Sequence, residues 1–301
     1  MIFCIQYGTV YTSIKARALS ARRLSVRPCP AMLRQGPGRK DGWIMKKLLT
    51  GALSLLMAAG LLAGCKSLPK IEVSSVEDLN GLKIGVQSGT TGETYAKENL
   101  EATVSGFKSG MDAALDLKNG GLDAIILDEL PAKSIVAQNS DLTIVDLDLE
   151  PEEYAIAVKK GNTELVNQIN ATLAKMKEDG SYDALTAAYM PADGKITIPE
   201  ALATEGAETL TMGTNAAFAP FEYLEGTEIV GFDVSLSQAI AADQGKKLVI
   251  ENMEFDALIS ALSAGQVDFV AAGMSVTPER LENVDFTDAY YSSKQVIILR
   301  K

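Results

Sequence analysis

Residues 273–280 read Gly-Met-Ser-Val-Thr-Pro-Glu-Arg and contain the residue types best suited to hold an anion. Thr277 suits the N-cap of a helix, and the proline after it suits the first helical position. Arg280 would then lie in the first helical turn, where a cation opposes the helix dipole. A bound carboxylate would compensate this charge, because it can accept a bidentate guanidinium fork together with the free amides of the helix start.

The same spacing is also compatible with an ordinary capped helix. In that interpretation Arg280 pairs with Glu279, with Glu282 or with solvent. The spacing alone does not separate the two interpretations.

Charge is distributed unevenly along the 301 residues. Residues 1–64 contain ten basic residues and one acidic residue, a balance of +9, whereas residues 65–301 contain 18 basic and 38 acidic residues, a balance of −20. The total is the net charge of −11. An acidic body repels phosphates and argues against a nucleic-acid partner.

The chain contains no histidine and three cysteines, of which none follows Cys65. Triads that need histidine and the commonest metal ligand are therefore absent from the sequence. No disulfide or thiol nucleophile is available after Cys65. We expect neither a metal nor a cofactor, whereas carboxylates, lysines, tyrosines and hydroxyls remain, so catalysis is restricted but not excluded.

Residues 45–65 are typical of a secretory signal, with a basic start and an uncharged run rich in leucine and alanine over residues 48–64. That run is short for a permanent membrane span. It ends in Leu-Ala-Gly-Cys, which resembles a bacterial lipobox and predicts lipidation at Cys65. A plain signal peptide followed by a chance cysteine is the alternative. Residues 1–44 are either a disordered leader or untranslated sequence, and we favour the second.

Strands alternate with helices over residues 71–150, which predicts a parallel or mixed sheet covered on both faces. One strand runs into a Gly- and Thr-rich helix start that includes Gly89 and Thr91, a second place for an anion. Asp128 follows a buried strand, where a charge would face a cleft at the carboxyl edge of an open sheet. Its alternative role is that of a helix N-cap.

Residues 151–190 are predicted to form a strand over 154–158 and an amphipathic core helix, and residues 191–208 read as a linker. Residues 209–301 again alternate strands and helices, with a loop of aromatic residues over 214–223. Asn215, Phe218 and Ser275 would lie at the carboxyl ends of successive strands, the edge at which open α/β sheets bind ligands.

Six stretches together resemble the bacterial extracellular solute-binding proteins for polar amino acids (solute-binding protein family 3), the receptors of ABC uptake systems. These are residues 78–81, 89–92, 123–128, 213–223 with 231–233, 273–280 and 285–291. The resemblance covers nearly all of residues 71–301. It implies a two-lobed, periplasmic-binding-protein-like (type II) α/β fold that closes on its ligand.

The resemblance also implies roles for individual residues. Arg280 would hold the α-carboxylate of an amino acid, helped by Ser275 and Thr91, with Gly89 leaving room. Asp128 and the carbonyl of Gly273 would take the α-ammonium group. The side chain would lie between Phe218 and Phe255, with Asn215 near its end.

The order of the parts departs from the family. Residues 71–150 correspond to the lobe that the family chain crosses into, here called lobe 2, and they come first. Residues 151–190 (the return segment) and 209–301 (the main part) correspond to lobe 1. We interpret this order as a circular permutation in which residues 296–301 form a free end of one crossing. A fragment of a tandem receptor and a swapped dimer are the alternatives.

The favoured function is therefore an extracytoplasmic lipoprotein that delivers a polar amino acid to the permease and ATPase of an ABC importer. A dehydratase-like or lytic enzyme on the same fold, a sensor module and a non-binding permuted fragment are the alternatives, because fold does not settle function.

Overall fold

The computed structural model describes residues 70–301. The predicted leader and signal peptide, including Cys65, lie outside this range. Within residues 70–301, no helix is both long and apolar enough to cross a membrane.

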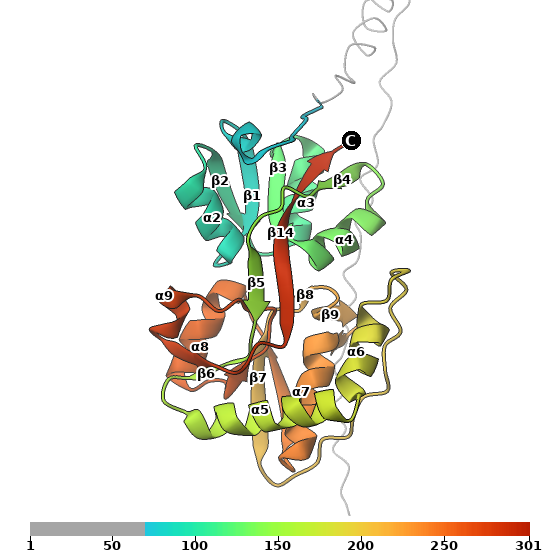
Figure 1. Cartoon of the computed structure of the whole chain (residues 1–301), viewed down its shortest axis with the longest axis vertical. Coiled ribbons are helices and arrows are strands. Elements are labelled where there is room, and N and C mark those ends of the chain that lie inside the picture. The colour runs from blue at the N-terminus through green and yellow to red at the C-terminus, as the bar shows by residue number, and fades with distance from the viewer. Residues whose placement is uncertain (1–69) are drawn as a thin grey trace, which may run out of the picture. The chain divides into compact units, whose positions relative to one another are not determined.

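Lobe 2 is built on a six-stranded mixed sheet (Figure 1). Its order is β2-β1-β3-β14-β4, and β5 pairs with β14. β1 is parallel to β2 and β3, whereas β14 is antiparallel to its neighbours. The strands are β1 (Lys83–Gln87), β2 (Thr103–Phe107), β3 (Ala124–Asp128), β4 (Leu142–Val145), β5 (Pro151–Tyr154) and β14 (Tyr291–Arg300).

Helices cover both faces of this sheet. Ile125 and Leu127 of β3 pack in one core cluster with residues of α3, while Ala124 and Ile126 pack in a second cluster with Ala96 of α2. Burial on both faces explains why β3 is an unbroken apolar run rather than an alternating one. The helices are η1 (Val76–Leu79), α2 (Thr91–Asn99), α3 (Gly110–Asn119) and α4 (Glu129–Gln138).

Lobe 1 contains a five-stranded sheet of order β11-β7-β12-β6-β13 and a small antiparallel sheet of order β10-β9-β8. The first consists of β6 (Ala157–Lys159), β7 (Thr209–Thr214), β11 (Lys247–Asn252), β12 (Phe269–Val270) and β13 (Val284–Phe286). The second consists of β8 (Ala217–Phe218), β9 (Glu222–Glu225) and β10 (Glu228–Val230).

The predicted core stripe of the long helix α5 is confirmed, because Leu165, Ile169, Leu173 and Met176 are buried. The helices of lobe 1 are α5 (Thr163–Glu178), α6 (Ser181–Tyr189), α7 (Phe232–Asp243), η2 (Phe255–Ala257), α8 (Leu258–Ala264) and α9 (Pro278–Leu281). Between α6 and β7, residues 191–208 contain no helix or strand.

Two strands connect the lobes, and they run side by side (Figure 1). β14 pairs with β5 antiparallel from Tyr291↔Tyr154 to Lys294↔Pro151. β14 then continues between β3 and β4 as an inner strand of the lobe 2 sheet. Residues 296–300, part of the stretch expected to form a free end of one crossing, are thus paired within this sheet. The domain boundaries stay predictions.

Three local expectations also change. The strand expected over 154–158 divides into β5 and β6, because the chain leaves the lobe 2 sheet after Tyr154 and enters the lobe 1 sheet at Ala157. The aromatic loop over 214–223 contributes β8 and part of β9 to the small sheet. β2 was not expected at all, since it is an edge strand with a glycine in it and no fully buried residue.

Candidate functional site

The segment 273–280 is held against the connecting strand β5 and the residue that follows it. Met274 accepts a backbone hydrogen bond from Ala155, and Val276 donates one to Glu153, both at 3.0 Å. The N-cap prediction is confirmed, because the Thr277 hydroxyl accepts from the Arg280 amide at the start of α9. The motif is thus attached to the element that joins the lobes.

Gly273 begins this segment in a conformation that only glycine adopts readily. Its φ is +53°, and a Cβ atom there would lie 2.7 Å from the Phe218 ring. Its amide donates to Asp233 Oδ2 at 2.9 Å. The turn can therefore pack directly on Phe218 only because no side chain intervenes.

Arg280 is almost completely buried and lies between the lobes. Nη1 donates to the Ser275 carbonyl at 2.6 Å, and Nη2 donates to the Gly89 carbonyl of lobe 2 at 3.0 Å. The guanidinium carbon lies 5.5 Å from the centre of the Phe255 ring. No carboxylate among residues 70–301 forms an ion pair with Arg280, so the alternative of pairing with Glu279, Glu282 or solvent does not describe this structure.

Lobe 2 brings its own polar groups to the same place. Thr90 caps α2 through a bond accepted from the Glu93 amide, which sets Thr91 at the first helical position. Asp128 ends β3 and makes no side-chain cap to α4, so its carboxylate is not used as an N-cap. The carboxyl ends of β1 and β3 therefore face the Arg280 segment.

The two half-sites meet in one small, partly open cavity of about 10 Å³. Seven of the nine predicted ligand-binding residues line it, together with two that were not predicted: Gln87, Thr90, Thr91, Asp128, Phe218, Phe255, Gly273, Ser275 and Arg280. The other two predicted residues contact the lining. Gly89 accepts from Arg280, and Asn215 Oδ1 accepts from Gln87 Nε2 at 2.9 Å.

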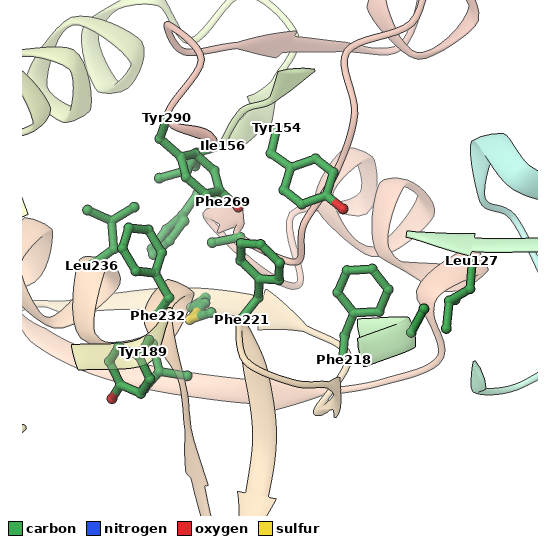
Figure 2. Packing of buried hydrophobic residues seen from close by; sticks show 14 of the residues in the cluster. Leu127, Tyr154, Ile156, Tyr189, Phe218, Phe221, Phe232, Leu236, Phe269 and Tyr290 are labelled. Carbon is green, nitrogen blue, oxygen red and sulfur yellow. The ribbon is translucent and has the colours of Figure 1, made fainter. Parts of the chain in front are cut away.

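Two aromatic rings, Phe218 and Phe255, line the cavity, and Phe218 also belongs to the packed aromatic cluster shown in Figure 2. The Phe218 and Phe221 ring centres are 6.0 Å apart, and Tyr154 meets Phe221 edge-on at 5.2 Å. In Figure 2 the Tyr154 hydroxyl points toward Phe218 and Leu127 rather than into the core of lobe 1. The buried Phe218 ring thus packs against an aromatic cluster that contains Phe221 and Tyr154.

The Asp128 side chain is buried and its pKa is raised to about 7. Burial is the main cause, and the nearby charge of Glu152 adds to it. Hydrogen bonds from the Tyr154 hydroxyl and Gln295 Nε2, and the charge of Arg280, act in the opposite direction. A positive group placed in the cavity would favour the carboxylate further.

Glu152 and Gln295 also contact the site residues, although neither was predicted from the sequence. Glu152 Oε2 accepts from the Ser275 hydroxyl at 2.6 Å, and Oε1 accepts from Gln295 Nε2 at 3.3 Å. Glu152 lies on β5 and Gln295 on β14, so both connecting strands reach the site. Burial lowers the pKa of Arg280, and the charges of Glu152 and Asp128 oppose that shift.

The lobes are in close contact around the cavity. Lys108 Nζ lies 2.9 Å from Glu254 Oε1 across the rim, and Ser134 donates to the Ala219 carbonyl at 3.2 Å. A cavity of this size holds at most one water molecule. A larger ligand can enter only if the lobes separate or the lining side chains move.

Among residues 70–301, no group of three or more histidine, cysteine, aspartate or glutamate side chains is arranged to hold a metal ion. The charged groups of the site are instead a guanidinium and two carboxylates. These are groups that recognise ions and zwitterions by hydrogen bonding.

Two α/β lobes joined by paired strands, with opposite charges meeting in the cleft between them, define a two-lobed binding protein. The chain belongs to the bacterial extracellular solute-binding proteins, family 3, whose family model matches residues 18–192 and 210–301. The family consists of extracellular solute-binding receptors, which confirms the predicted fold class and the expectation of a protein that is not an enzyme.

Similar proteins carry names of the same kind. The arginine-binding extracellular protein ArtP of Bacillus subtilis is 48% identical over 96 residues, which cover 32% of this chain and 38% of ArtP. A probable histidine-binding protein of Campylobacter jejuni is 40% identical over 93 residues, covering 31% of this chain and 36% of that protein. The chain thus spans less than two-fifths of the length of each of these relatives.

Solved structures are matched over similar lengths. An ancestral arginine-binding protein bound to arginine shares 43% identity over 30% of this chain and 39% of its own, with a TM-score of 0.28. An arginine-specific periplasmic binding protein of Salmonella typhimurium shares 38% identity over 28% of this chain and 38% of its own, with a TM-score of 0.28.

Proposed function

We propose that the chain is a lipid-anchored extracytoplasmic receptor that binds a polar amino acid between its lobes and delivers it to an ABC importer. The observation that carries the proposal is that Arg280 of lobe 1 and Asp128 of lobe 2 line one cavity. A zwitterion needs one cationic and one anionic partner, and each lobe contributes one of them. Binding would then favour the closed arrangement of the lobes over an open one.

The α-carboxylate is assigned to Arg280, Ser275 and Thr91. The guanidinium is buried and its two outer nitrogens donate to carbonyls rather than to a carboxylate. A carboxylate ligand would replace part of this weaker neutral bonding with a charge-assisted pair. Gly89 supports the assignment because a Cβ atom there would lie 2.9 Å from Cβ of Asp256, so the backbone can approach lobe 1 closely.

The α-ammonium group is assigned to Asp128 and the carbonyl of Gly273. Asp128 is buried, and its donors among residues 70–301 are Tyr154 and Gln295, both of which are uncharged. An ammonium group would supply the missing positive charge in a region of low dielectric constant, where such a pair is stronger than in water.

The ligand side chain is assigned to the space between Phe218 and Phe255. Beyond it lie Gln87 and Asn215, which are hydrogen-bonded to each other across the lobes. Gln87 Oε1 is buried without a hydrogen-bond partner in the described part of the chain. A ligand side chain with a hydrogen-bond donor would satisfy this acceptor.

Within this class, a basic amino acid is the ligand that the site charges favour. Asp128 and Glu152 bring two carboxylates to the site, and Arg280 brings one guanidinium. A ligand with an additional positive charge would offset the second carboxylate. The relatives named for arginine and histidine bind basic amino acids by name, which supports the same choice.

The test is isothermal calorimetry and thermal-shift measurement on the full chain with each of the twenty amino acids. We expect saturable binding of one or more polar amino acids and a rise in Tm that grows with ligand concentration. Binding limited to apolar amino acids, or no binding at all, would contradict the proposal. Binding of neutral but not basic amino acids would contradict only the choice of a basic ligand.

Lipid anchoring is proposed from the sequence of residues 45–65 alone, with Cys65 as the modified residue. Expression of the full chain with a labelled fatty acid should give a labelled, membrane-associated protein. Cys65→Ser should remove both the label and the association, and Ser67→Ala, two residues further along the chain, is the matched control that should keep both. Label that persists in Cys65→Ser would exclude this cysteine.

The permuted order of the lobes is proposed as well. It is supported by the packing of Leu299, near the end of β14, in the same core cluster as Val73, near the start of lobe 2. In the family order these two stretches would follow each other directly. Light scattering after size exclusion should give a monomer, whereas a dimer that dissociates only on unfolding would favour exchange of β14 between two chains.

A further inference from the structure

A second pair of acidic side chains lies behind the ligand cleft, in the interior of lobe 1. Glu222 on β9 and Asp233 on α7 are both fully buried. No lysine or arginine within residues 70–301 forms an ion pair with either of them. Two buried like charges without a cation would be costly, so the pair requires another explanation.

The hydrogen bonds of the pair involve only one of its four carboxyl oxygens among the described residues. Asp233 Oδ2 accepts from the Gly273 amide at 2.9 Å and from the Tyr290 hydroxyl at 2.7 Å. Within the described residues, Asp233 Oδ1 and both carboxyl oxygens of Glu222 find no donor if both groups are ionised. Buried acceptors are rarely left without a donor. A proton on Glu222 supplies one, since a carboxylic acid can donate to the facing Asp233 carboxylate.

The surroundings contain nothing that would stabilise a second negative charge. The titratable groups that face the pair come from three other segments and are all acidic or phenolic: Tyr290 before β14, Tyr182 on α6 and Asp128 at the end of β3. Burial raises the pKa of Glu222 well above its usual value, and the facing Asp233 adds to that shift. Burial also raises the pKa of Asp233 to about 6, although the hydrogen bonds from Tyr290 and Gly273 lower it.

We propose that Glu222 is a carboxylic acid that shares its proton with Asp233, and that this singly protonated pair positions the Gly273 turn at the ligand cleft. Glu222 and Asp233 are positioning residues, because neither lines the cavity. Asp233 holds the Gly273 amide, and Gly273 packs on Phe218, which lines the cavity. The importance of the turn for a ligand rests on the proposed function, whereas the shared proton does not.

The first test measures the shared proton without any ligand. In the native protein the pair keeps one proton at pH 5–8. In the unfolded chain both carboxyl groups have ordinary pKa values and lose their protons below this range. The free energy of unfolding should therefore fall as the pH rises. We compare urea unfolding of wild type and Glu222→Gln from pH 5 to pH 8. Glutamine keeps a donor toward Asp233 and cannot ionise. The unfolding constant of wild type should rise relative to that of the variant by up to tenfold per pH unit.

The contribution of Asp128 is common to both proteins and cancels in this comparison. Glu225→Gln, at an exposed position of the same strand, is the matched control and should follow wild type. Parallel curves for wild type and Glu222→Gln would overturn the proposal, because they would mean that Glu222 binds no additional proton in the native state.

The second test identifies which member of the pair is charged. It also tests whether that residue is hydrogen-bonded to the Gly273 amide. The Gly273 amide resonance at pH 7 should coincide in wild type and Glu222→Gln, and it should shift in Asp233→Asn, where the acceptor is neutral. An equal shift in Glu222→Gln and Asp233→Asn would overturn the assignment of the charge to Asp233. Both tests use ligand-free protein. If they succeed and no amino acid binds, the proposed function fails and the acid pair remains.

Discussion

Asp128 and Asp233 are both buried acids with another acid nearby, yet they lie in different surroundings. Asp128 lies in the cleft between the lobes, and Arg280 lines the same cavity. Asp233 lies in the interior of lobe 1 and faces Glu222, Tyr290 and a backbone amide. Burial raises the pKa of both groups, to about 7 and about 6 respectively.

The difference shows how similar burial can serve two purposes. The Asp128 site contains a cation and an opening that depends on lobe movement, so a charged ligand can complete its electrostatics. The Asp233 site is sealed, so only a proton can reduce its charge. If this comparison is right, changes in the cleft should alter ligand binding, and changes in the interior should alter stability.

The largest effect is expected from Arg280→Ala, which removes the cation that distinguishes the two sites. We expect a loss of about 2–5 kcal/mol in amino-acid binding, because a buried carboxylate of the ligand would lose its partner. Calorimetry measures this loss. Arg280→Lys should lose less, since it keeps the charge but not the planar fork. Glu279→Ala, at the exposed neighbouring position, should bind normally; near-normal affinity in Arg280→Ala would reject the assigned site.

Gly273→Ala should destabilise the protein, because the Gly273 turn contacts both Asp233 in the interior of lobe 1 and Phe218 at the cleft. The positive φ and the contact with Phe218 should together cost about 1–3 kcal/mol of the free energy of unfolding. Gly265→Ala is the matched control, because its φ is +73° but the nearest atom to a Cβ is Lys159 Nζ at 3.9 Å. Urea unfolding gives both values. Equal losses would show that the Phe218 contact does not matter.

Acidification should weaken amino-acid binding. Asp128 has a pKa of about 7 in the ligand-free cleft, and a bound ammonium group should lower it. Binding then releases a proton, so affinity should fall by up to tenfold, or about 1.4 kcal/mol, per pH unit below pH 7. Calorimetry in buffers of different ionisation enthalpy measures that proton. Asp128→Asn should bind weakly and without this dependence on pH between 5 and 7; a retained dependence would assign it to another group.

The smallest effect is expected from Glu152→Gln. Removing this charge should lower the pKa of Asp128 and move the midpoint of the pH profile downward, because Glu152 raises it in wild type. For a neutral amino acid the affinity should change by less than tenfold, since partly exposed charges interact by about 1 kcal/mol or less. For a basic amino acid the loss should be larger. Equal losses for both would argue against a basic ligand.

The sequence predicted the parts of the site that depend on local chemistry. Thr277 and the proline after it predict the start of the helix that carries Arg280. Asp128 stands at the end of a strand that is apolar in sequence. Both signals are contained in a few consecutive residues. The rule that ligands bind at the carboxyl edge of such sheets placed each group within its own lobe, whereas their meeting across the lobes was implied only by the resemblance to the solute-binding family.

Other features could not be predicted because they depend on contacts between distant segments. Glu152 looks like one of several acids in a polar stretch, and only the pairing of β5 with β14 brings it to Gln295 and Ser275. Glu222 follows an aromatic residue at a position that could be exposed, and only the packing of β9 on α7 buries it. The sequence also gave no reason to divide the strand over 154–158 between two sheets.

The placement of β14 has a consequence for how the molecule folds. This strand lies between β3 and β4, although most of lobe 1 separates it from them in the chain. The sheet of lobe 2 therefore stays incomplete during synthesis until the lobe 1 residues have been made. Contacts this distant in sequence slow the search for the native state. We expect the two lobes to fold and unfold in a single cooperative transition rather than one after the other.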